Sequence, residues 1–436
     1  MKTFLRWMVT AIFSMTLAFA APEQGNGALP AAKDAFAGVA VRNVQRTVLQ
    51  DNISHYRYDI RVGSGQFDVI RLHRVVKELT PGQMVRTVNG VLLLPGAPTY
   101  FEAVFMTPLI SQAVPSDHSI ALYLAKNDID VWGMDYRWAM IPAETTDLSF
   151  MKDWGFAKDR QDAQIAMSVA RFIRLFSGQG SGQLHLLGFS WGGMIGYSIA
   201  SEETQQPGFL RSLKGLIALD IGVKLEKEAD RETNNCSWVE SDQAALDSGV
   251  YNADSGSFLK QLGGLALSAP NDPSDNIPGM TNYQAALFAG TSNEFSGGQS
   301  WHFVGGYLDE NGIPSDLRYS KARVWLDLLQ NVPTHFPVRA GADSDLWMCG
   351  KTDVTFTEHL GQIAIPILHV GAAGGFGKAG FYSATFTKSK DVKTVLVQRL
   401  ADDKRQEDFG HADTVFANDA ETAVWKPILD WIFAHR

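Results

Sequence analysis

A serine at the centre of the pentapeptide "GFSWG", residues 188–192, has the sequence context of a nucleophile. The pentapeptide fits the pattern G-x-S-x-G, in which a Ser on a sharp strand-to-helix turn points its hydroxyl out of a sheet. An apolar run precedes it at residues 184–189, and a helical pattern follows at residues 191–200. The N-terminus of such a helix favours negative charge. We therefore predict that Ser190 is a nucleophile rather than a plain turn residue.

A Ser hydroxyl is a weak nucleophile unless a base takes its proton, and His is the most frequent base. The chain has ten His. Structural roles are expected for those in predicted strands or at the terminus, namely His55, His73, His185 and His435. His411 stands in "EDFGHADTVF", between the last predicted strand and the last predicted helix. It is the leading candidate base, and His369, at the end of a predicted strand, is its rival.

Strands alternating with helices surround these residues. Strands are predicted near residues 55–62, 67–75, 91–94, 129–134, 184–189, 215–219, 363–371 and 392–400, and helices near 116–125, 158–176, 191–200 and 421–433. Ser116 is a possible N-cap of the first helix. This alternation is typical of a mostly parallel, doubly wound α/β sheet.

The alternation stops after residue 222, where a stretch rich in Asn, Asp, Ser and Gly begins, and it resumes near residue 360. Residues 223–359 are therefore predicted to be an insertion rather than a second independent fold. The single sheet domain would comprise residues 21–222 and 360–436, with a loose leader at about residues 21–36.

With its G-x-S-x-G turn, its alternating strands and its late His, the chain resembles the α/β-hydrolase superfamily over about residues 50–222 and 360–436. The insertion lies where that family places its cap or lid. The resemblance implies an α/β-hydrolase fold with an inserted cap. It also implies that His411, which follows the last strand, is the general base.

The resemblance further implies an oxyanion hole built from two backbone N–H groups. One would belong to Trp191, directly after the nucleophile, and the other to Ala97, after the strand in "VLLLPG". The family often has His-Gly in that loop, whereas this chain has Pro95-Gly96. Tyr100 is expected at the pocket wall. The alternative is that this loop is a simple turn.

The acid of a catalytic triad is missing from its most frequent place in the family. That place follows the strand beyond the cap, where this chain has "HVGAAGGFG" with Gly374 at the expected position. Some members carry the acid one strand earlier, and Asp220 in "GLIALDIG" has that position. Asp220 is therefore the predicted acid, with a loop-capping role as the alternative. Its rivals are Asp343, Asp345 and Asp413.

No cofactor and no metal are expected. The patterns H-E-x-x-H and C-x-x-C are absent, and "GAAGGFGKA" lacks the Ser or Thr that a phosphate-binding loop requires. The glycines of this run are instead expected to keep space near His411 and the missing acid.

The insertion is rich in aromatic residues, which can line a pocket for a bulky apolar substrate or form the core of the cap itself. Trp301 and Phe303 are the predicted pocket residues, in "EFSGGQSWHFVGG". Because Gly residues stand on both sides of this aromatic cluster, the segment is also a candidate for a mobile lid.

The N-terminus has the pattern of a secretory signal. Lys2 and Arg6 precede an apolar run over residues 7–17, and Ala18-Phe19-Ala20 forms a small-residue cleavage site. A cut after Ala20 and a secreted or periplasmic protein are expected, with an uncleaved anchor as the alternative. No later run is long and apolar enough to span a bilayer.

The formal net charge is −9, and loss of residues 1–20 would make the chain more acidic still. This balance argues against partners such as nucleic acid or an anionic membrane. Two Cys, Cys236 and Cys349, suggest one disulfide in an oxidising compartment, with two buried free thiols as the alternative.

Together these patterns predict a serine hydrolase that cleaves a small or lipid-like carboxylic ester through an acyl-enzyme. A lactone, an amide or a carbon–carbon bond beside a ketone would suit the same residues. A hydrolase-fold binding protein without activity is a third possibility, because a fold alone does not fix function.

Overall fold

The computed structural model describes residues 39–87, 89–180, 182–227, 235–293, 301–350, 354 and 359–436. The predicted signal at residues 1–20 and the predicted leader at residues 21–36 lie outside this part of the chain.

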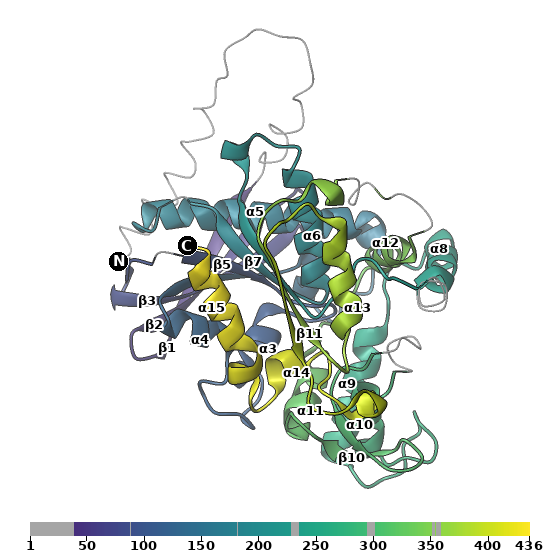
Figure 1. Cartoon of the computed structure of the whole chain (residues 1–436). Helices are drawn as coiled ribbons and strands as arrows, with labels where there is room; N and C mark the ends of the chain where they lie inside the picture. The colour runs from purple at the N-terminus through teal and green to yellow at the C-terminus, as the bar shows by residue number, and fades with distance from the viewer. Residues whose placement is uncertain are drawn as a thin grey trace.

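One sheet of ten strands runs through the described chain (Figure 1). Its strands are β1 (Ala40–Gln50), β2 (Ile53–Arg61), β3 (Val69–Thr80), β4 (Gln83–Met84), β5 (Asn89–Leu94), β6 (Ile129–Asp135), β7 (Leu184–Phe189), β8 (Leu213–Leu219), β11 (Ile367–Ala372) and β12 (Val392–Val397). Their order is β1-β2-β3-β6-β5-β7-β8-β11-β12, with β4 paired to β3. The pairs up to β3–β6 are antiparallel, and the pairs from β6 to β12 are parallel.

Helices cover both faces of this sheet (Figure 1). Those outside the insertion are α3 (Phe101–Phe105), α4 (Ile120–Lys126), α5 (Phe156–Phe176), α6 (Trp191–Glu203), α13 (Gly377–Phe381), α14 (Asp413–Phe416) and α15 (Lys426–Ala434). On β5, Leu92 and Leu94 pack with α5 and α6, whereas Val91 and Leu93 pack with α3, α4 and α15. Because both faces are buried, the parallel strands are apolar at successive positions, as the sequence shows.

The insertion between β8 and β11 is mainly helical. It contains α8 (Ser237–Asp247), α9 (Ser255–Ser268), α10 (Asn282–Thr291), α11 (Ala322–Asn331), α12 (Val338–Cys349) and a small sheet of β9 (Gly306–Leu308) and β10 (Pro314–Leu317). Side chains of α9, α10 and α11 join the core around α3 and α4, and side chains of α12 join the core around α5 and α6. The insertion therefore shares the two cores of the sheet domain.

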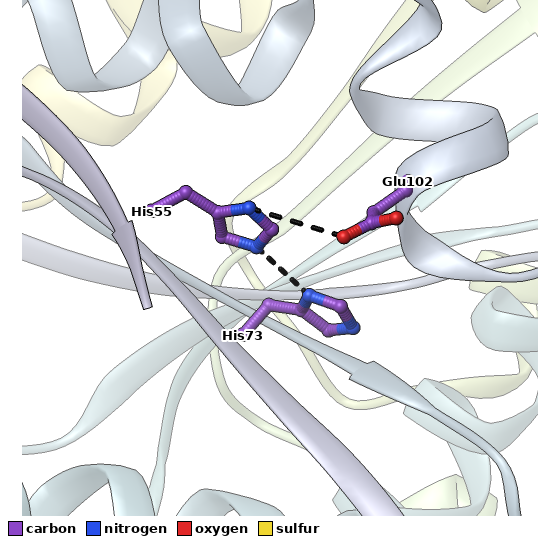
Figure 2. A group of neighbouring side chains, drawn as sticks. All are labelled: His55, His73 and Glu102. Atoms are coloured by element: carbon purple, nitrogen blue, oxygen red, sulfur yellow. Dashed lines mark hydrogen bonds and ion pairs between the residues drawn. The ribbon is translucent and has the colours of Figure 1, made fainter. Parts of the chain in front are cut away.

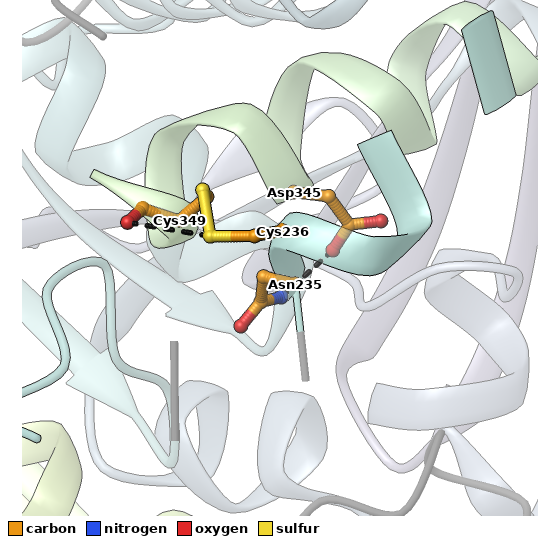
Figure 3. Close-up of a disulfide and its surroundings, with 4 residues drawn as sticks. All are labelled: Asn235, Cys236, Asp345 and Cys349. Atoms are coloured by element: carbon orange, nitrogen blue, oxygen red, sulfur yellow. Dashed lines mark hydrogen bonds between the residues drawn. A yellow bond between two sulfur atoms is a disulfide. The ribbon is translucent and has the colours of Figure 1, made fainter. Parts of the chain in front are cut away.

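A disulfide closes the insertion. Cys236, just before α8, is bonded to Cys349 at the end of α12, with an S–S distance of 2.03 Å (Figure 3). Beside it, the Asn235 amide donates a hydrogen bond of 2.8 Å to the Asp345 carboxylate. The sequence left bonded and free thiols open, and in the structure the two Cys are joined.

Several local expectations differ from the structure. The strand expected over residues 363–371 begins at Ile367, and the one expected over residues 392–400 ends at Val397.

The helix expected from Ser116 begins at Ile120, because the Ser119 hydroxyl accepts the N–H of Leu122 at 3.1 Å and caps this end. Residues 116–118 form a turn after Pro115. Strand β1 was not predicted, since its side chains are mostly exposed or half-buried at the sheet edge and lack a clear apolar alternation.

Candidate active site

Ser190 occupies a tight turn between β7 and α6. Its backbone has φ 53° and ψ −120°, a left-handed value that a residue other than Gly adopts only under strain. The flanking glycines are required by packing. A methyl group at Gly188 would lie 2.2 Å from the Gly192 carbonyl oxygen, and one at Gly192 would lie 2.2 Å from the Leu94 carbonyl oxygen. The spacing G-x-S-x-G therefore follows from the close approach of β5, β7 and α6.

Asp220 directly follows β8 and is fully buried. Its Oδ2 lies 2.7 Å from His411 Nδ1 and accepts the N–H of Phe376 at 3.1 Å. Its Oδ1 accepts the N–H groups of Ala372 at 2.8 Å and Gly377 at 3.1 Å. Because a carboxylate accepts, Nδ1 carries the imidazole proton, and Nε2 is left to accept one.

The glycine-rich loop after β11 surrounds the Asp220 carboxylate instead of supplying an acid of its own. A methyl group at Gly375 would lie 2.0 Å from Asp220 Oδ2. A methyl group at Gly374 would lie 2.4 Å from Nε2 of His302, so a side chain does not fit at the position where an acid was sought. The glycine run thus keeps the space around this acid open, as the sequence analysis expected.

Ser190 and His411 line one cavity of about 220 Å³. Gly96 and Ala97 line it too, and a methyl group at Gly96 would lie 2.9 Å from the Ser190 Cβ. The rest of the wall is mainly apolar and comes from α9, α10 and α11, from the sheet domain and from Phe303. Among the described residues that line the cavity, there is no Asp, Glu, Lys or Arg.

Trp191 turns its side chain away from this cavity. The indole N–H donates to Asp159 Oδ2 at 3.1 Å, and the same oxygen accepts the indole N–H of Trp138 at 3.1 Å. Asp159 is buried, and burial raises its pKa to about 7. The backbone N–H of Trp191 is therefore the part of this residue to consider for an oxyanion hole.

Of the three predicted pocket residues, one lines the cavity and two do not. Phe303 lines the cavity, whereas Tyr100 and Trp301 are not among its lining residues. Tyr100 precedes α3 and packs against the core around that helix. Trp301 packs against the His411 ring, at 5.0 Å between ring centroids.

The rival acids have other partners. Asp343 accepts the N–H of Phe156 at the start of α5 at 3.0 Å. Asp345 accepts from Asn235 beside the disulfide. Asp413 accepts the N–H groups of Gly305 and Gly410, each at 2.8 Å. The structure thus brings Asp220, and not these three, to the His411 ring.

The rival base also lies elsewhere. His369 is fully buried within β11, where its Nδ1 lies 3.4 Å from the Tyr197 hydroxyl. His185 is buried within β7, and its Nε2 lies 3.1 Å from the His435 carbonyl oxygen.

Figure 2 shows a second group of neighbouring side chains, formed by the buried His55 and His73 and the half-buried Glu102. His73 Nε2 lies 3.0 Å from Asp135, so it carries the proton, and His73 Nδ1 must accept from His55 Nε2 at 2.9 Å. Of the four ring nitrogens, His55 Nδ1 is then the one whose lone pair is not used in these hydrogen bonds. It lies 3.9 Å from Glu102 Oε1. That oxygen is also 3.3 Å from the Arg57 cation. His55, His73 and Asp135 thus form a chain of hydrogen bonds that joins β2, β3 and β6, and it leaves a single ring nitrogen beside Glu102 for a metal.

Known proteins match this chain through structure rather than sequence. No protein-family model matches it, and no curated protein matches it either. A protein of Sulfolobus solfataricus, provisionally named a lipase, superposes with a TM-score of 0.62 at 21% identity, over 90% of this chain and 99% of its own. The chain has the α/β-hydrolase fold.

Two further solved structures match with lower TM-scores. A soluble variant of monoglyceride lipase from Saccharomyces cerevisiae, in complex with a substrate analogue, has a TM-score of 0.48 at 14% identity, over 91% of this chain and 96% of its own. A protein of Nostoc that is provisionally named an α/β hydrolase has a TM-score of 0.41 at 13% identity, over 89% of this chain and 98% of its own. The sheet arrangement and the Sulfolobus match confirm the α/β-hydrolase fold predicted from the sequence, whereas the cap role of the insertion stays a prediction.

The fold places the candidate residues at one edge of the sheet. Because β5, β7, β8 and β11 are parallel, the loops that follow them meet at their carboxyl ends.

No helix in the described chain is long and apolar enough to cross a membrane.

Proposed function

We propose that the chain is a serine hydrolase that cleaves carboxylic esters through an acyl-enzyme. The hydrogen bond of 2.7 Å between His411 Nδ1 and buried Asp220, beside a cavity that Ser190 and His411 both line, carries this proposal. The Sulfolobus protein that shares the fold is provisionally named a lipase, which is in keeping with it.

In the proposed reaction, Ser190 Oγ attacks the ester carbonyl carbon while its proton moves to His411 Nε2. Asp220 keeps the Nδ1 proton in place and stabilises the imidazolium that results. The tetrahedral intermediate collapses when His411 returns the proton to the leaving alkoxide, and the alcohol departs. A water molecule then gives a proton to His411 and attacks the acyl carbon, which forms a second tetrahedral intermediate. This intermediate collapses when His411 passes that proton to Ser190 Oγ, so the acid is freed and both Ser190 and His411 are restored.

The carbonyl oxygen gains charge as the tetrahedral intermediate forms. We assign its stabilisation to the backbone N–H groups of Ala97 and Trp191. Ala97 lines the cavity beside Ser190, and Trp191 begins α6, so its N–H is one of the groups that the helix itself leaves without a partner. The tie between the Trp191 indole and Asp159 holds that end of the helix in place.

The cavity favours an uncharged, apolar acyl group. An apolar cavity of about 150 Å³ takes up benzene, so a cavity of about 220 Å³ has room for roughly nine carbon atoms. A charged acyl group would lose its hydration without meeting an opposite charge on the described wall. Esters of medium-length fatty acids fit this description.

A fluorophosphonate probe and a substrate panel test the proposal. The probe should modify Ser190, and p-nitrophenyl esters should be hydrolysed faster than lactones, anilides and diketones of similar size. Faster turnover of one of those classes would assign the same residues to that bond. An unmodified Ser190 with no turnover on any of the panel would point to a binding protein.

We also propose a secreted or periplasmic location, with cleavage after Ala20. The Cys236–Cys349 disulfide supports this, since disulfides persist in oxidising compartments. Mass spectrometry of the protein from the secreting cell should find Ala21 at the N-terminus. An intact chain found only in the cytoplasm would contradict the location.

A further inference from the structure

Aromatic rings enclose the His411 imidazole, which is 1% exposed. Phe189 is stacked on it, with 4.6 Å between ring centroids and 26° between the planes. Trp301, Phe376 and Phe303 stand around it at steeper angles, at 5.0, 5.7 and 5.9 Å. We call these four side chains the aromatic cage.

The cage is assembled from three separate parts of the chain. Phe189 ends β7, Phe376 belongs to the glycine-rich loop, and residues 301–303 belong to the insertion. Backbone hydrogen bonds fix this last segment against the site. The His411 N–H donates to the His302 carbonyl oxygen, and the His302 N–H donates to the Gly374 carbonyl oxygen, each at 3.0 Å. The insertion thus contributes contacts to the candidate base as well as to the cavity.

The charged and titratable groups near the cage are engaged elsewhere, except for Asp220. Asp413 binds backbone N–H groups and the Ser320 hydroxyl. Arg405 donates to two carbonyl oxygens of the glycine-rich loop. The His302 ring lies between the carbonyl oxygens of Val304 and Arg405, and burial lowers its pKa.

The imidazolium formed in the proposed reaction is a buried cation with one carboxylate partner. Burial of a charge is costly unless other groups replace its hydration. The faces of aromatic rings are negative and attract cations, and the attraction is strongest where water is excluded. Phe189 presents its face to the imidazole, and the centroids of the other three rings lie within about 6 Å of it, the range over which an aromatic ring attracts a cation.

We propose that the aromatic cage stabilises the protonated form of His411 and thereby speeds acyl-enzyme formation. Its members act as positioning residues, because they work through His411. This inference rests on the proposed hydrolase function, and it adds to that function a role for the insertion, whose Trp301 and Phe303 act through His411.

Paired variants distinguish the effect of an aromatic ring from the effect of side-chain volume. Trp301→Leu removes the ring, whereas Trp301→Phe keeps one. Phe376→Leu and Phe376→Tyr form a second pair. Tyr307→Leu is the matched control, because Tyr307 is 45% exposed in the same insertion and packs on Arg318. The measurements are kcat and KM on one p-nitrophenyl ester and the pH profile of kcat/KM. The rates are divided by the concentration of active sites, which is determined by titration with a fluorophosphonate.

Each Leu variant should lower kcat by roughly three- to tenfold with little change in KM, and the aromatic variants should recover most of the loss. The acid limb of the kcat/KM profile should move to lower pH by about half a unit in the Leu variants, because the protonated base loses stabilisation. Tyr307→Leu should change neither quantity.

A shift of the acid limb to higher pH would overturn the proposal, since it would mean that the rings disfavour the cation by excluding water. An unchanged limb would overturn it as well. If a Leu variant is too weakly active, the same midpoint is followed by NMR of the His411 ring in the Ser190→Ala background. Wild-type protein that no fluorophosphonate modifies would instead remove the proposed function itself, so the two failures are distinguishable.

Discussion

The Asp220 carboxylate lies 2.7 Å from the His411 ring, although the two residues are 191 positions apart. Asp220 follows β8, and its carboxylate accepts three N–H groups from the end of the next strand in the sheet, β11, and the residues just beyond it: Ala372, Phe376 and Gly377. The glycine-rich loop, which contains no acidic residue of its own, thus lies against an acid that follows the neighbouring strand.

Asp220→Asn should lower kcat by about 10³ to 10⁴, because an amide no longer stabilises the imidazolium or fixes the tautomer of His411. The rate is measured on an activated ester across pH 5–9. Asp345→Asn, beside the disulfide, is the control and should keep a rate close to that of the wild type. A near-normal rate in Asp220→Asn would assign the acid role to another residue.

Gly375→Ala should impair both folding and activity, since its methyl group would lie 2.0 Å from Asp220 Oδ2. We expect a loss of about 1–3 kcal/mol in the free energy of unfolding, measured by urea denaturation, together with a large fall in kcat. Gly361→Ala is the matched control, because the nearest atom to its methyl group would be 3.7 Å away. Equal effects of the two substitutions would count against the close packing of this loop.

The cavity should set the preferred acyl length. Ala289 and Leu328, on α10 and α11, both line it. Ala289→Phe fills part of the cavity and should move the optimum of kcat/KM to shorter p-nitrophenyl esters, whereas Leu328→Ala enlarges it and should move the optimum to longer ones. Each methylene gained or lost is worth about 0.8 kcal/mol, or roughly fourfold in kcat/KM. Identical chain-length profiles in both variants would show that the acyl group binds elsewhere.

Stability should depend on pH through Asp159. Burial raises its folded-state pKa to about 7, above the ordinary value of 3.8. The folded state therefore holds a proton that the unfolded state has lost between these values. The contribution, on the order of a few kcal/mol, is present below about pH 4 and is lost as the pH rises to about 7.

Asp159→Asn cannot ionise, so the fall in unfolding free energy between pH 5 and pH 7.5 should be smaller in this variant. Its amide oxygen can still accept from the indoles of Trp138 and Trp191. The exposed Asp430→Asn serves as the control. An equal pH slope in Asp159→Asn and wild type would show that this carboxyl is already ionised at pH 5.

The fold and the tight turn at Ser190 could be predicted from the sequence because their signals are local. The apolar run of β7, Ser190 between two glycines and the helix after them are contiguous, and β7 has the predicted bounds. The assignment of Asp220 needed one further step, namely the absence of an acid near Gly374 and the presence of one after the previous strand.

The contacts around His411 could not be predicted, because they join segments that are distant in the sequence. Phe189, Phe376 and residues 301–303 meet only once the sheet and the insertion have folded. The insertion itself lacks the strand–helix alternation from which the other elements were predicted. The one available signal was the run "GAAGGFG", whose small residues indicated that something approaches that loop closely.

In the proposed reaction Ser190 is the nucleophile, and His411 and Asp220 activate it. Mass spectrometry after treatment with a fluorophosphonate tests this claim most directly. We expect one adduct per chain, located on the peptide that contains Ser190, no adduct in Ser190→Ala, and labelling slowed at least a hundredfold in His411→Ala. An unmodified wild-type chain, or an adduct on another residue that persists in Ser190→Ala, would contradict the claim.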